Sequence, residues 1–443
     1  MSPQELFHLV QTEARSHGVH DVEVTIGQTT DALTRFANNT IHQNVAETNT
    51  AISVRPQENQ RTARAETNRL DSDSVRRAVR DAITLMRSQE PDDRLLPLFE
   101  PEPVVTVERV AESTVSCTPS ERAGAVAEAI RIAESEGQTA AGIYSTGVTR
   151  ETLINSGGVF ASHEQSMAVF SVTMLETGSS GWAKASAVDR SRLDVAALAR
   201  QASRKAIESR NPREVEPGRY TVILEPAAVL DLVGQMFGDF GGTALEDKRS
   251  FLTDRLGSEL FGENITIYDD CTHPLQSGSG FDGEGVARRA LTLVKRGVVQ
   301  DLAYSRGAAQ RADKAATGHG LPVPNEVGEY PLNIVIAGGG VSVDEMIRST
   351  DRGILVTRLW YIREVDPYEK MMTGMTRDGT FLIERGEVVG GVRNFRFNQG
   401  LIELLNNVES AGPAVRASGE ETFDMVVPPF KAHEFHFTEV TRF

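Results

Sequence analysis

Cysteine is scarce in this sequence, which has only Cys117 and Cys271 among its 443 residues. The two cysteines stand far apart along the chain. Their number and spacing exclude a disulfide framework, and they also exclude a Cys-x-x-Cys zinc knuckle.

Long hydrophobic runs are missing as well. Apolar residues make up 40% of the chain, but no stretch approaches the roughly 18 uninterrupted apolar residues that a membrane-spanning helix needs. The N-terminal stretch "MSPQELFHLVQTEARSHG" has no basic segment followed by an apolar core, so it is not typical of a signal peptide. We therefore expect a cytoplasmic protein with no membrane partner.

The sequence also lacks an excess of positive charge. It has 46 Lys and Arg against 62 Asp and Glu, for a net charge of −16. A protein that binds the phosphate backbone of a nucleic acid needs a basic face. We therefore expect no nucleic-acid partner.

The N-terminal part contains two successive sets of helix-like and strand-like segments. Residues 3–18 and 71–89 have apolar residues at helical spacing, and several short alternating segments lie between them. A second set follows, with helix-like residues 119–137 and 193–210 around further strand-like segments. This order predicts an antiparallel sheet, formed either by an internal duplication or by one α+β domain.

A boundary is expected at "NPREVEPGR", residues 211–219, where prolines and a glycine interrupt regular structure. Most segments after it are strand-like. The sequence thus predicts an α+β protein with two domains. Residues 1–215 form an N-terminal α+β domain with an antiparallel sheet, and residues 216–443 form a β-rich C-terminal domain.

The stretch "GSGFDGEGVARRALTLVKRG", residues 278–297, contains the pattern G-x-G-x-x-G. In a dinucleotide site the glycines directly follow a strand and open a helix whose N-terminus receives the pyrophosphate. Here seven residues separate them from the strand-like "ITIYDD", and Asp282 and Glu284 would repel a phosphate. We predict instead a glycine-rich loop leading into a β-hairpin that turns at Gly297.

Several motifs in the C-terminal half occur in a characteristic order: "KRSFLTDRLGSELF", "FDGEGVARRALTLVKRGVVQDL", "ATGHG", "STDRGILVTRLWYI" and "GTFLIERGEVVGGVRNFRFNQGLIELLNNVE". From about residue 216 to the end the chain closely resembles the TldD/PmbA family. Members of that family are metallopeptidases and their partner subunits, once labelled modulators of DNA gyrase. The resemblance implies that residues Asp282, Gly283, Glu284 and Gly285 form a family-pattern loop before a β-hairpin.

The resemblance also implies where a zinc site would lie. TldD-like chains carry H-E-x-x-x-H on the first helix after the domain boundary, whereas the partner type, TldE or PmbA, lacks it. The matching segment here is "LDLVGQ", with Leu230, Asp231 and Gln235 at the three motif positions. Leucine has no lone pair for zinc, and a glutamine oxygen is a poor substitute for imidazole. We expect no family-type zinc site on this helix.

Three other residues are weaker candidates for a site. Cys271 and His273 form a Cys–His pair two residues apart, which could supply a nucleophile or a metal ligand. His319 in "ATGHG" lies on a glycine-rich loop of the family pattern. It could contact substrate or a partner there, or be a solvated turn histidine.

These observations favour a TldE/PmbA-like, non-catalytic subunit of a heteromeric TldD/TldE-type metallopeptidase. Such a chain would need no cofactor of its own, because the resemblance places the zinc in a TldD-like partner. The implied substrates are peptides and unfolded small proteins, including precursors of peptide natural products. The alternative is an autonomous hydrolase with a non-standard metal or cysteine site.

Overall fold

A computed structural model describes residues 1–441, and its N-terminal region contains one antiparallel sheet of seven strands. The strand order is β3-β2-β1-β5-β6-β7, and β4 also pairs with β2. The bounds are β1 (Asp21–Ala37), β2 (Thr40–Glu58), β3 (Arg61–Thr62), β4 (Ala65–Thr67), β5 (Thr139–Asn155), β6 (Phe160–Glu176) and β7 (Ser179–Ala187). The predicted N-terminal antiparallel sheet is confirmed.

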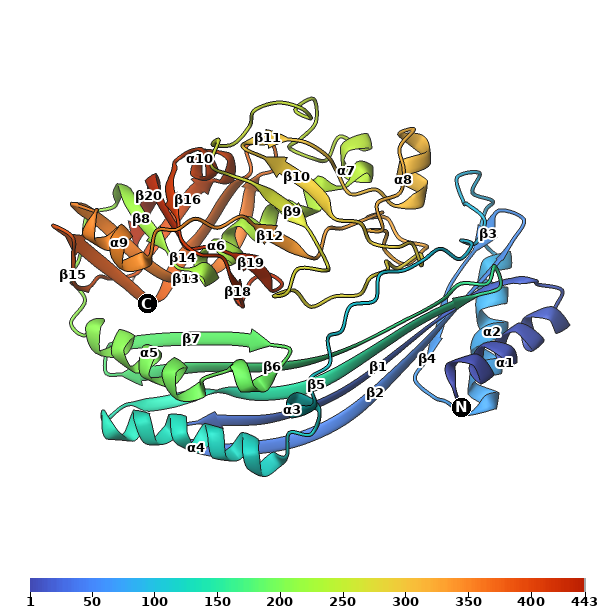
Figure 1. Ribbon diagram of the computed structural model, residues 1–443, viewed down its shortest axis with the longest axis horizontal. Helices are drawn as coiled ribbons and strands as arrows, with labels where there is room; N and C mark the ends of the chain where they lie inside the picture. The colour runs from blue at the N-terminus through green and yellow to red at the C-terminus, as the bar shows by residue number, and fades with distance from the viewer. Residues whose placement is uncertain (442–443) are drawn as a thin grey trace.

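The two predicted sets of elements meet in this single sheet, because β1 pairs with β5 along almost its whole length. Helices cover the two ends of the long strands separately (Figure 1). One pair packs on one apolar core and the other pair on a second core. The helices are α1 (Pro3–Ser16), α2 (Ser72–Arg87), the short α3 (Glu112–Val115), α4 (Pro119–Ser135), the 3-10 turn η1 (Arg190–Arg192) and α5 (Val195–Glu208).

The sequence explains why α2 begins where it does. The Asp71 side chain accepts a hydrogen bond from the backbone N–H of Ser74, at 2.9 Å, and so caps the helix. Val75, Val79 and Ile83 recur at helical spacing and are buried against the sheet. The helical spacing of the apolar residues was predicted.

The C-terminal region is strand-rich, as predicted. Five of its strands form a closed ring, β13-β8-β20-β16-β14, because β13 also pairs with β14. The strands of this sheet are β8 (Gly218–Leu224), β13 (Arg352–Asp366), β14 (Met371–Glu384), β15 (Glu387–Gly391), β16 (Phe395–Gly400), β17 (Val408–Ala411) and β20 (Phe430–Val440).

A second, open sheet of six strands lies beside the ring, in the order β11-β10-β9-β12-β19-β18. Its strands are β9 (Ile267–Asp269), β10 (Leu291–Lys295), β11 (Val298–Val299), β12 (Ile334–Ile336), β18 (Val415–Ala417) and β19 (Met425–Val427). The helical segments of the region are α6 (Pro226–Val233), η2 (Gly234–Phe240), α7 (Gly242–Glu246), α8 (Arg306–Arg311), α9 (Val343–Arg348) and α10 (Leu401–Asn406). The largest apolar core takes residues from both sheets and from α6.

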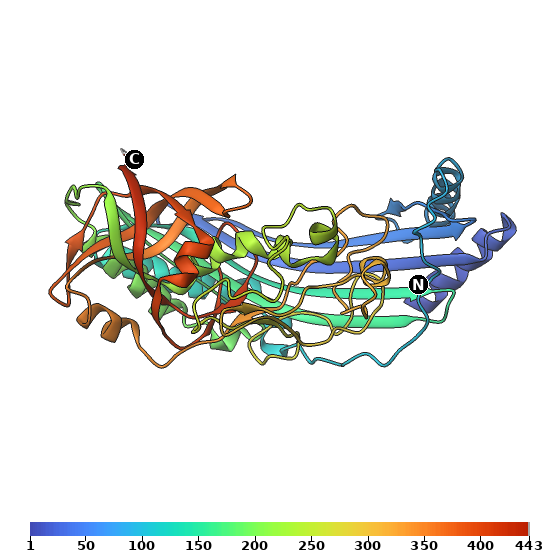
Figure 2. The same cartoon turned by 90° about the horizontal axis from the view of Figure 1, so that it is seen from above.

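The C-terminal region lies across one face of the long N-terminal strands, as Figure 2 shows from above. Arg358 of β13 marks the contact between the two regions. Its guanidinium lies 5.0 Å from the ring centre of Trp182 on β7 and 5.3 Å from that of Trp360 on β13. Because Arg358 is buried and donates to Asp378 at 2.9 Å, it joins the two regions rather than facing solvent.

The G-x-G-x-x-G stretch is a closely packed loop followed by a hairpin, as predicted. A Cβ atom at Gly278 would lie 2.2 Å from Asn333 Oδ1, and one at Gly280 would lie 1.9 Å from Val105 O. These two glycines are needed because other chain segments approach too closely for a side chain. The β10–β11 hairpin turns at Arg296 and Gly297, which have φ of 48° and 80°.

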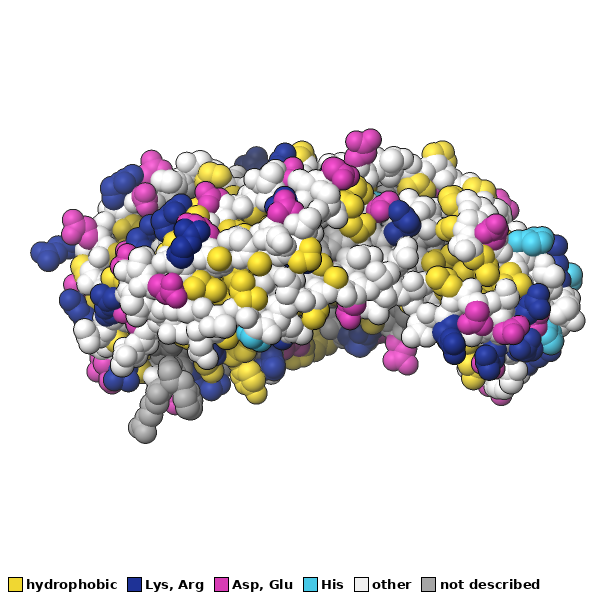
Figure 3. All heavy atoms as spheres, turned by 90° about the horizontal axis from the view of Figure 1, so that it is seen from below, with side chains coloured by type: hydrophobic (Ala, Val, Ile, Leu, Met, Phe, Trp, Pro, Cys, Tyr) yellow, Lys and Arg dark blue, Asp and Glu magenta, His cyan; other side chains and the backbone are white. Residues whose placement is uncertain are grey.

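The surface and the helices agree with the composition. On the face in Figure 3, Lys and Arg side chains of the described residues are interspersed with Asp and Glu rather than gathered into a basic surface. Within residues 1–441, no helix combines the length and the apolar composition that crossing a bilayer requires.

Candidate functional site

Helix α6 and the first residues of η2 carry the three positions, Leu230, Asp231 and Gln235, that the sequence comparison matched to the zinc motif. Leu230 is fully buried and belongs to the large apolar core. Gln235 lies just beyond α6, and its side-chain amide donates to the backbone oxygen of Asp231 at 3.2 Å. Neither side chain offers an imidazole for zinc.

The Asp231 carboxylate binds the backbone of a distant loop, residues 419–421. Its Oδ1 accepts hydrogen bonds from the N–H groups of Glu421 at 2.9 Å and Glu420 at 3.1 Å. The approach is so close that a Cβ atom at Gly419 would lie 2.1 Å from that oxygen. The carboxylate therefore fixes the loop.

Burial governs the acidity of Asp231. Its side chain is fully buried, and desolvation raises its pKa to about 6, although the backbone N–H groups of Glu421 and Glu420 oppose the shift. The carboxylate is buried against the 419–421 loop, and the contacts that it makes there are structural.

The loop is also tied to the N-terminal region and to β13. Lys184 of β7 lies 3.3 Å from a carboxylate oxygen of Glu420. The backbone N–H of Tyr361 on β13 donates to the Glu421 side chain at 2.7 Å. Residues 419–421 thus connect α6, β7 and β13.

The family-pattern loop at residues 282–285 contains a second buried carboxylate. Asp282 Oδ1 accepts from the N–H groups of Glu284 and Val286, both at 2.9 Å, and its Oδ2 accepts from Gly320 at 2.7 Å. These bonds hold the loop against residues 318–320. Asp282 therefore acts as a turn cap.

Glu284 differs from Asp282 because it also lines a pocket. Its Oε1 accepts from the backbone N–H of Arg306 at 3.0 Å, and its Oε2 lies 3.8 Å from the Arg306 guanidinium. Burial first, and then the negative charge of Asp282, raise the pKa of Glu284 to about 7. An acid that titrates near neutrality at a pocket wall is typical of a functional position.

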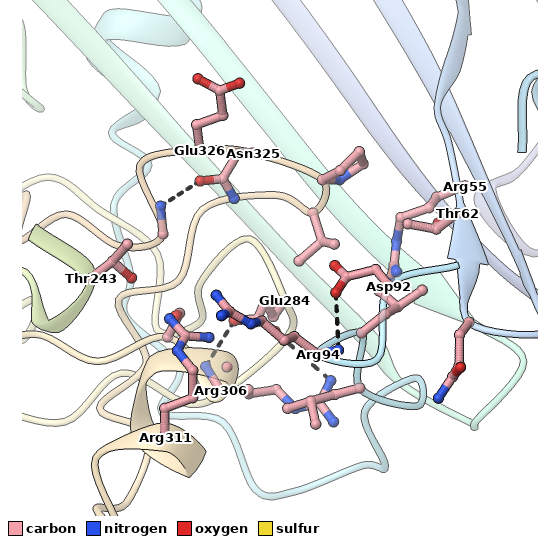
Figure 4. Close-up of a pocket in the computed structure, with 18 of the residues that line it drawn as sticks. Arg55, Thr62, Asp92, Arg94, Thr243, Glu284, Arg306, Arg311, Asn325 and Glu326 are labelled. Carbon is pink, nitrogen blue, oxygen red and sulfur yellow. Dashed lines mark hydrogen bonds and ion pairs between the residues drawn. The ribbon is translucent and has the colours of Figure 1, made fainter. Parts of the chain in front are cut away.

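This pocket lies between the two regions of the protein and has a volume of about 340 Å³. Its walls come from β2, from the connector after α2, and from loops around Glu284, α8 and residues 323–328. Figure 4 shows Arg94, Arg306 and Arg311 on the same side of the pocket as Glu284, whereas the carboxylate of Glu326 points away from them. Sequence reasoning missed these arginines, because residues so far apart along the chain leave no motif.

His319 is neither a solvated turn residue nor a surface contact. Its side chain is completely buried, with Nδ1 2.9 Å from Thr317 Oγ1 and Nε2 3.1 Å from Asp269 Oδ1. Burial raises the pKa of Asp269, but the hydrogen bond and charge of His319 outweigh it and leave that pKa below its ordinary value. His319 therefore connects β9 to the loop that holds Asp282.

Cys271 and His273 do not form a reactive pair with His319 in the described structure. Cys271 is buried, and desolvation raises the pKa of its thiol, which opposes thiolate chemistry. The His273 Nδ1 accepts from the N–H of Leu275 at 3.2 Å. Among residues 1–441, no group of three or more His, Cys, Asp and Glu side chains is arranged to hold a metal ion.

Comparisons with known proteins agree with this architecture. The family model described as the PmbA/TldA metallopeptidase C-terminal domain matches residues 217–439, and the one described as the PmbA/TldA metallopeptidase central domain matches residues 106–210. The fold thus places the chain in the α+β class, and the family models place it among metallopeptidase-related proteins. The chain belongs to the PmbA/TldD family.

Individual relatives are distant. A metalloprotease of Methanothermobacter thermautotrophicus is 26% identical over 51% of this chain and 50% of its own length. Metalloprotease PmbA of Escherichia coli O157:H7 is 24% identical over 47% of this chain and 44% of its own length. The chain therefore aligns with about half the length of these curated relatives, and a TldD homolog is also among the relatives.

Solved structures match over nearly the whole chain. The crystal structure of TldE from Thermococcus kodakarensis superimposes with a TM-score of 0.87, covering 98% of this chain and 99% of that one. The identity is 20%, so this likeness concerns the fold.

Proposed function

We propose that this chain is the TldE/PmbA-like, non-catalytic subunit of a heteromeric TldD/TldE-type metallopeptidase. In this proposal the zinc is held by a TldD-like partner, and the chain completes a cleft that accepts peptides or unfolded small proteins. The TldE likeness of the fold and the presence of both PmbA and TldD relatives support such a pairing.

The proposal rests on the contacts of three side chains in α6 and directly after it. Leu230 is buried in the core, Gln235 is bonded to the helix backbone, and Asp231 is occupied by the 419–421 loop. A catalytic zinc site needs three protein ligands and an open position for water. Helix α6 contributes none of the imidazoles that such a site uses.

The test compares the chain alone with the chain mixed with a family member that carries H-E-x-x-x-H and comes from the same organism. We expect no stoichiometric zinc in the isolated chain by metal analysis, and no cleavage of a casein or peptide substrate. The mixture should cleave the substrate, and a chelator should abolish that cleavage. Robust cleavage by the isolated chain would contradict the proposal and favour an autonomous hydrolase.

The same mixture tests the role of α6. Replacing Gln235 with Ala should leave the activity of the mixture within about twofold, because this side chain makes one bond, to the backbone oxygen of Asp231 in α6. Loss of activity in the Gln235→Ala mixture, with partner binding intact, would show that α6 takes part in the chemistry.

A further inference from the structure

The outer edge of β2 is open from the turn after β1 as far as β4. On its inner side β2 pairs with β1 along almost its whole length. On its outer side it pairs only through residues 52–54 with β4 and residues 57–58 with β3, and within residues 1–441 no strand pairs with the outer side of residues 40–51. Figure 2 shows β2, in blue, along the margin of the long strands. This segment therefore presents backbone N–H and C=O groups that another strand can bind.

The open edge has few of the features that usually prevent strands from pairing. Its sequence, "TIHQNVAETNTA", contains no proline, lysine or arginine. Its single bulge, at His42, lies near one end, and the register with β1 is regular from Gln43 onward. Residues 44–49 are all exposed, with Val45 at 42%. Such a segment is suited to backbone pairing with an extended partner.

Charged side chains are distributed unevenly about Val45 on one face of β1 and β2. Three directly opposite pairs share this face, because side chains two residues apart along a strand point to the same side: Asp31–Glu47, Leu33–Val45 and Arg35–Gln43. The two acids lie on one side of the apolar Leu33–Val45 pair. The arginine lies on the other side.

Neither the two acids nor the arginine has a partner of opposite charge. Asp31, Glu47 and Arg35 are exposed, and among the described residues 1–441 none of the three forms an ion pair. Like charges directly opposite each other destabilise a strand pair. Burial first, and then the charge of Glu47, raise the pKa of Asp31. A cation beside these two carboxylates would therefore stabilise this part of the sheet.

A second copy of the chain has such a cation at the matching position. When two β2 strands pair antiparallel about a two-fold axis through Val45, Glu47 of each copy lies opposite Gln43 of the other. The row Asp31–Glu47 of one copy then continues into the row Gln43–Arg35 of the second copy, and this happens on both sides of the axis. A two-fold axis through Glu47 would instead align four carboxylates. Charge complementarity therefore favours the register centred on Val45.

We propose that two copies of this chain associate through their β2 edges, antiparallel about Val45, and so form one continuous sheet. Backbone hydrogen bonds supply the affinity. The contact between the two Val45 side chains and the alignment of Arg35 with the acid pair fix the register. Pairing also removes the open edge from both copies. The inference concerns the isolated chain and does not depend on the proposed function.

Sedimentation velocity of the isolated chain tests the association between about 1 µM and about 200 µM. We expect the monomer to convert into a dimer as the concentration rises. Val45→Lys should abolish the dimer, because it places two ammonium groups side by side on the axis, whereas the β-branched Val45→Thr should keep it. Leu175→Lys, at an exposed position of β6, is the matched control and should leave the dimer unchanged. A chain that stays monomeric throughout, or a dimer that survives Val45→Lys, would overturn the proposal.

Charge exchange tests the register. Arg35→Glu should weaken dimerisation about tenfold, because the new carboxylate meets the acid pair twice across the axis. Adding Glu47→Arg should restore most of the affinity, since the exchanged charges attract again, and a double variant as weak as Arg35→Glu would overturn this register. In hydrogen exchange, amides of residues 43–48 should gain protection as the chain concentration rises. Protection that appears only when an extended peptide is added to a monomeric chain would overturn the second copy as the occupant.

Discussion

At the scale of single residues, Glu284 links pocket chemistry to stability. Its pKa in the folded chain, about 7, is above the ordinary value of 4.5, mainly because of burial. The folded state therefore binds the proton more tightly than the unfolded state, and ionisation of Glu284 opposes folding. The stabilisation of the folded state by protonated Glu284 is fully present below pH 4.5 and is lost as the pH rises through about 7.

We predict that Glu284→Gln removes this loss. The difference in unfolding free energy between the variant and the original chain should increase in favour of the variant by about 2 kcal/mol from pH 5 to pH 8. The amide oxygen of Gln can still accept from the Arg306 N–H. Urea unfolding at both pH values measures the effect, and Glu326→Gln, at an exposed position of the same pocket, is the matched control. Parallel pH curves for the original chain and Glu284→Gln would contradict the prediction.

At the scale of elements, the loop at residues 419–421 depends on α6. We predict that Asp231→Ala frees the Glu420 and Glu421 amides, so that they exchange with solvent much faster, at a cost of about 2 kcal/mol in unfolding free energy. Gly419→Ala should do the same, because its Cβ atom would collide with the carboxylate. Hydrogen exchange followed by mass spectrometry localises the change.

The matched control for this loop is Asp73→Ala, at an exposed position of α2, which should leave exchange at residues 419–421 unaltered. Faster exchange throughout the C-terminal region would indicate general unfolding rather than release of the loop. Unchanged exchange in both Asp231→Ala and Gly419→Ala would mean that the bonds to Asp231 do not hold the loop.

Elements with local signals were predictable from the sequence. The cap at Asp71, the stripe of α2 and the hairpin turn at Gly297 each depend on residues a few positions apart. The lengths of the strands were harder to predict from the sequence. Segments expected as separate short strands are joined in β1, of 17 residues, and β2, of 19 residues. The centres of these strands contain residues typical of turns, such as Gly27 and Asp31 in β1 and Asn44 and Asn49 in β2, and β1 pairs with the distant β5.

At the scale of the whole molecule, the fold class followed from the order of helix-like and strand-like segments. The candidate site did not follow, because its parts meet only after folding. Asp231 contacts residues almost 190 positions away, since Glu420 donates to it across a separation of 189. The guanidinium groups of Arg94 and Arg306 come from different regions that close on one pocket.

The two regions are also joined by an ion pair that spans their contact. Lys205 of α5 lies 2.5 Å from Glu225, the residue before α6, and their side chains are 7% and 18% exposed. Removing one partner of such a pair leaves a poorly solvated charge, whereas replacing both with apolar groups removes that penalty. Glu225 makes no side-chain cap bond to α6, so its replacement need not weaken the helix.

We therefore predict that Lys205→Met lowers the free energy of unfolding by about 2 kcal/mol, and that adding Glu225→Leu restores most of it. Urea unfolding followed by tryptophan fluorescence measures both, because Trp182 and Trp360 lie on the two sides of the contact around Arg358. With one tryptophan replaced by Phe at a time, the two probes should report the same midpoint if the regions unfold together. Additive losses in the double variant would show that Lys205 and Glu225 act independently, and separate midpoints would show that the contact does not couple the regions.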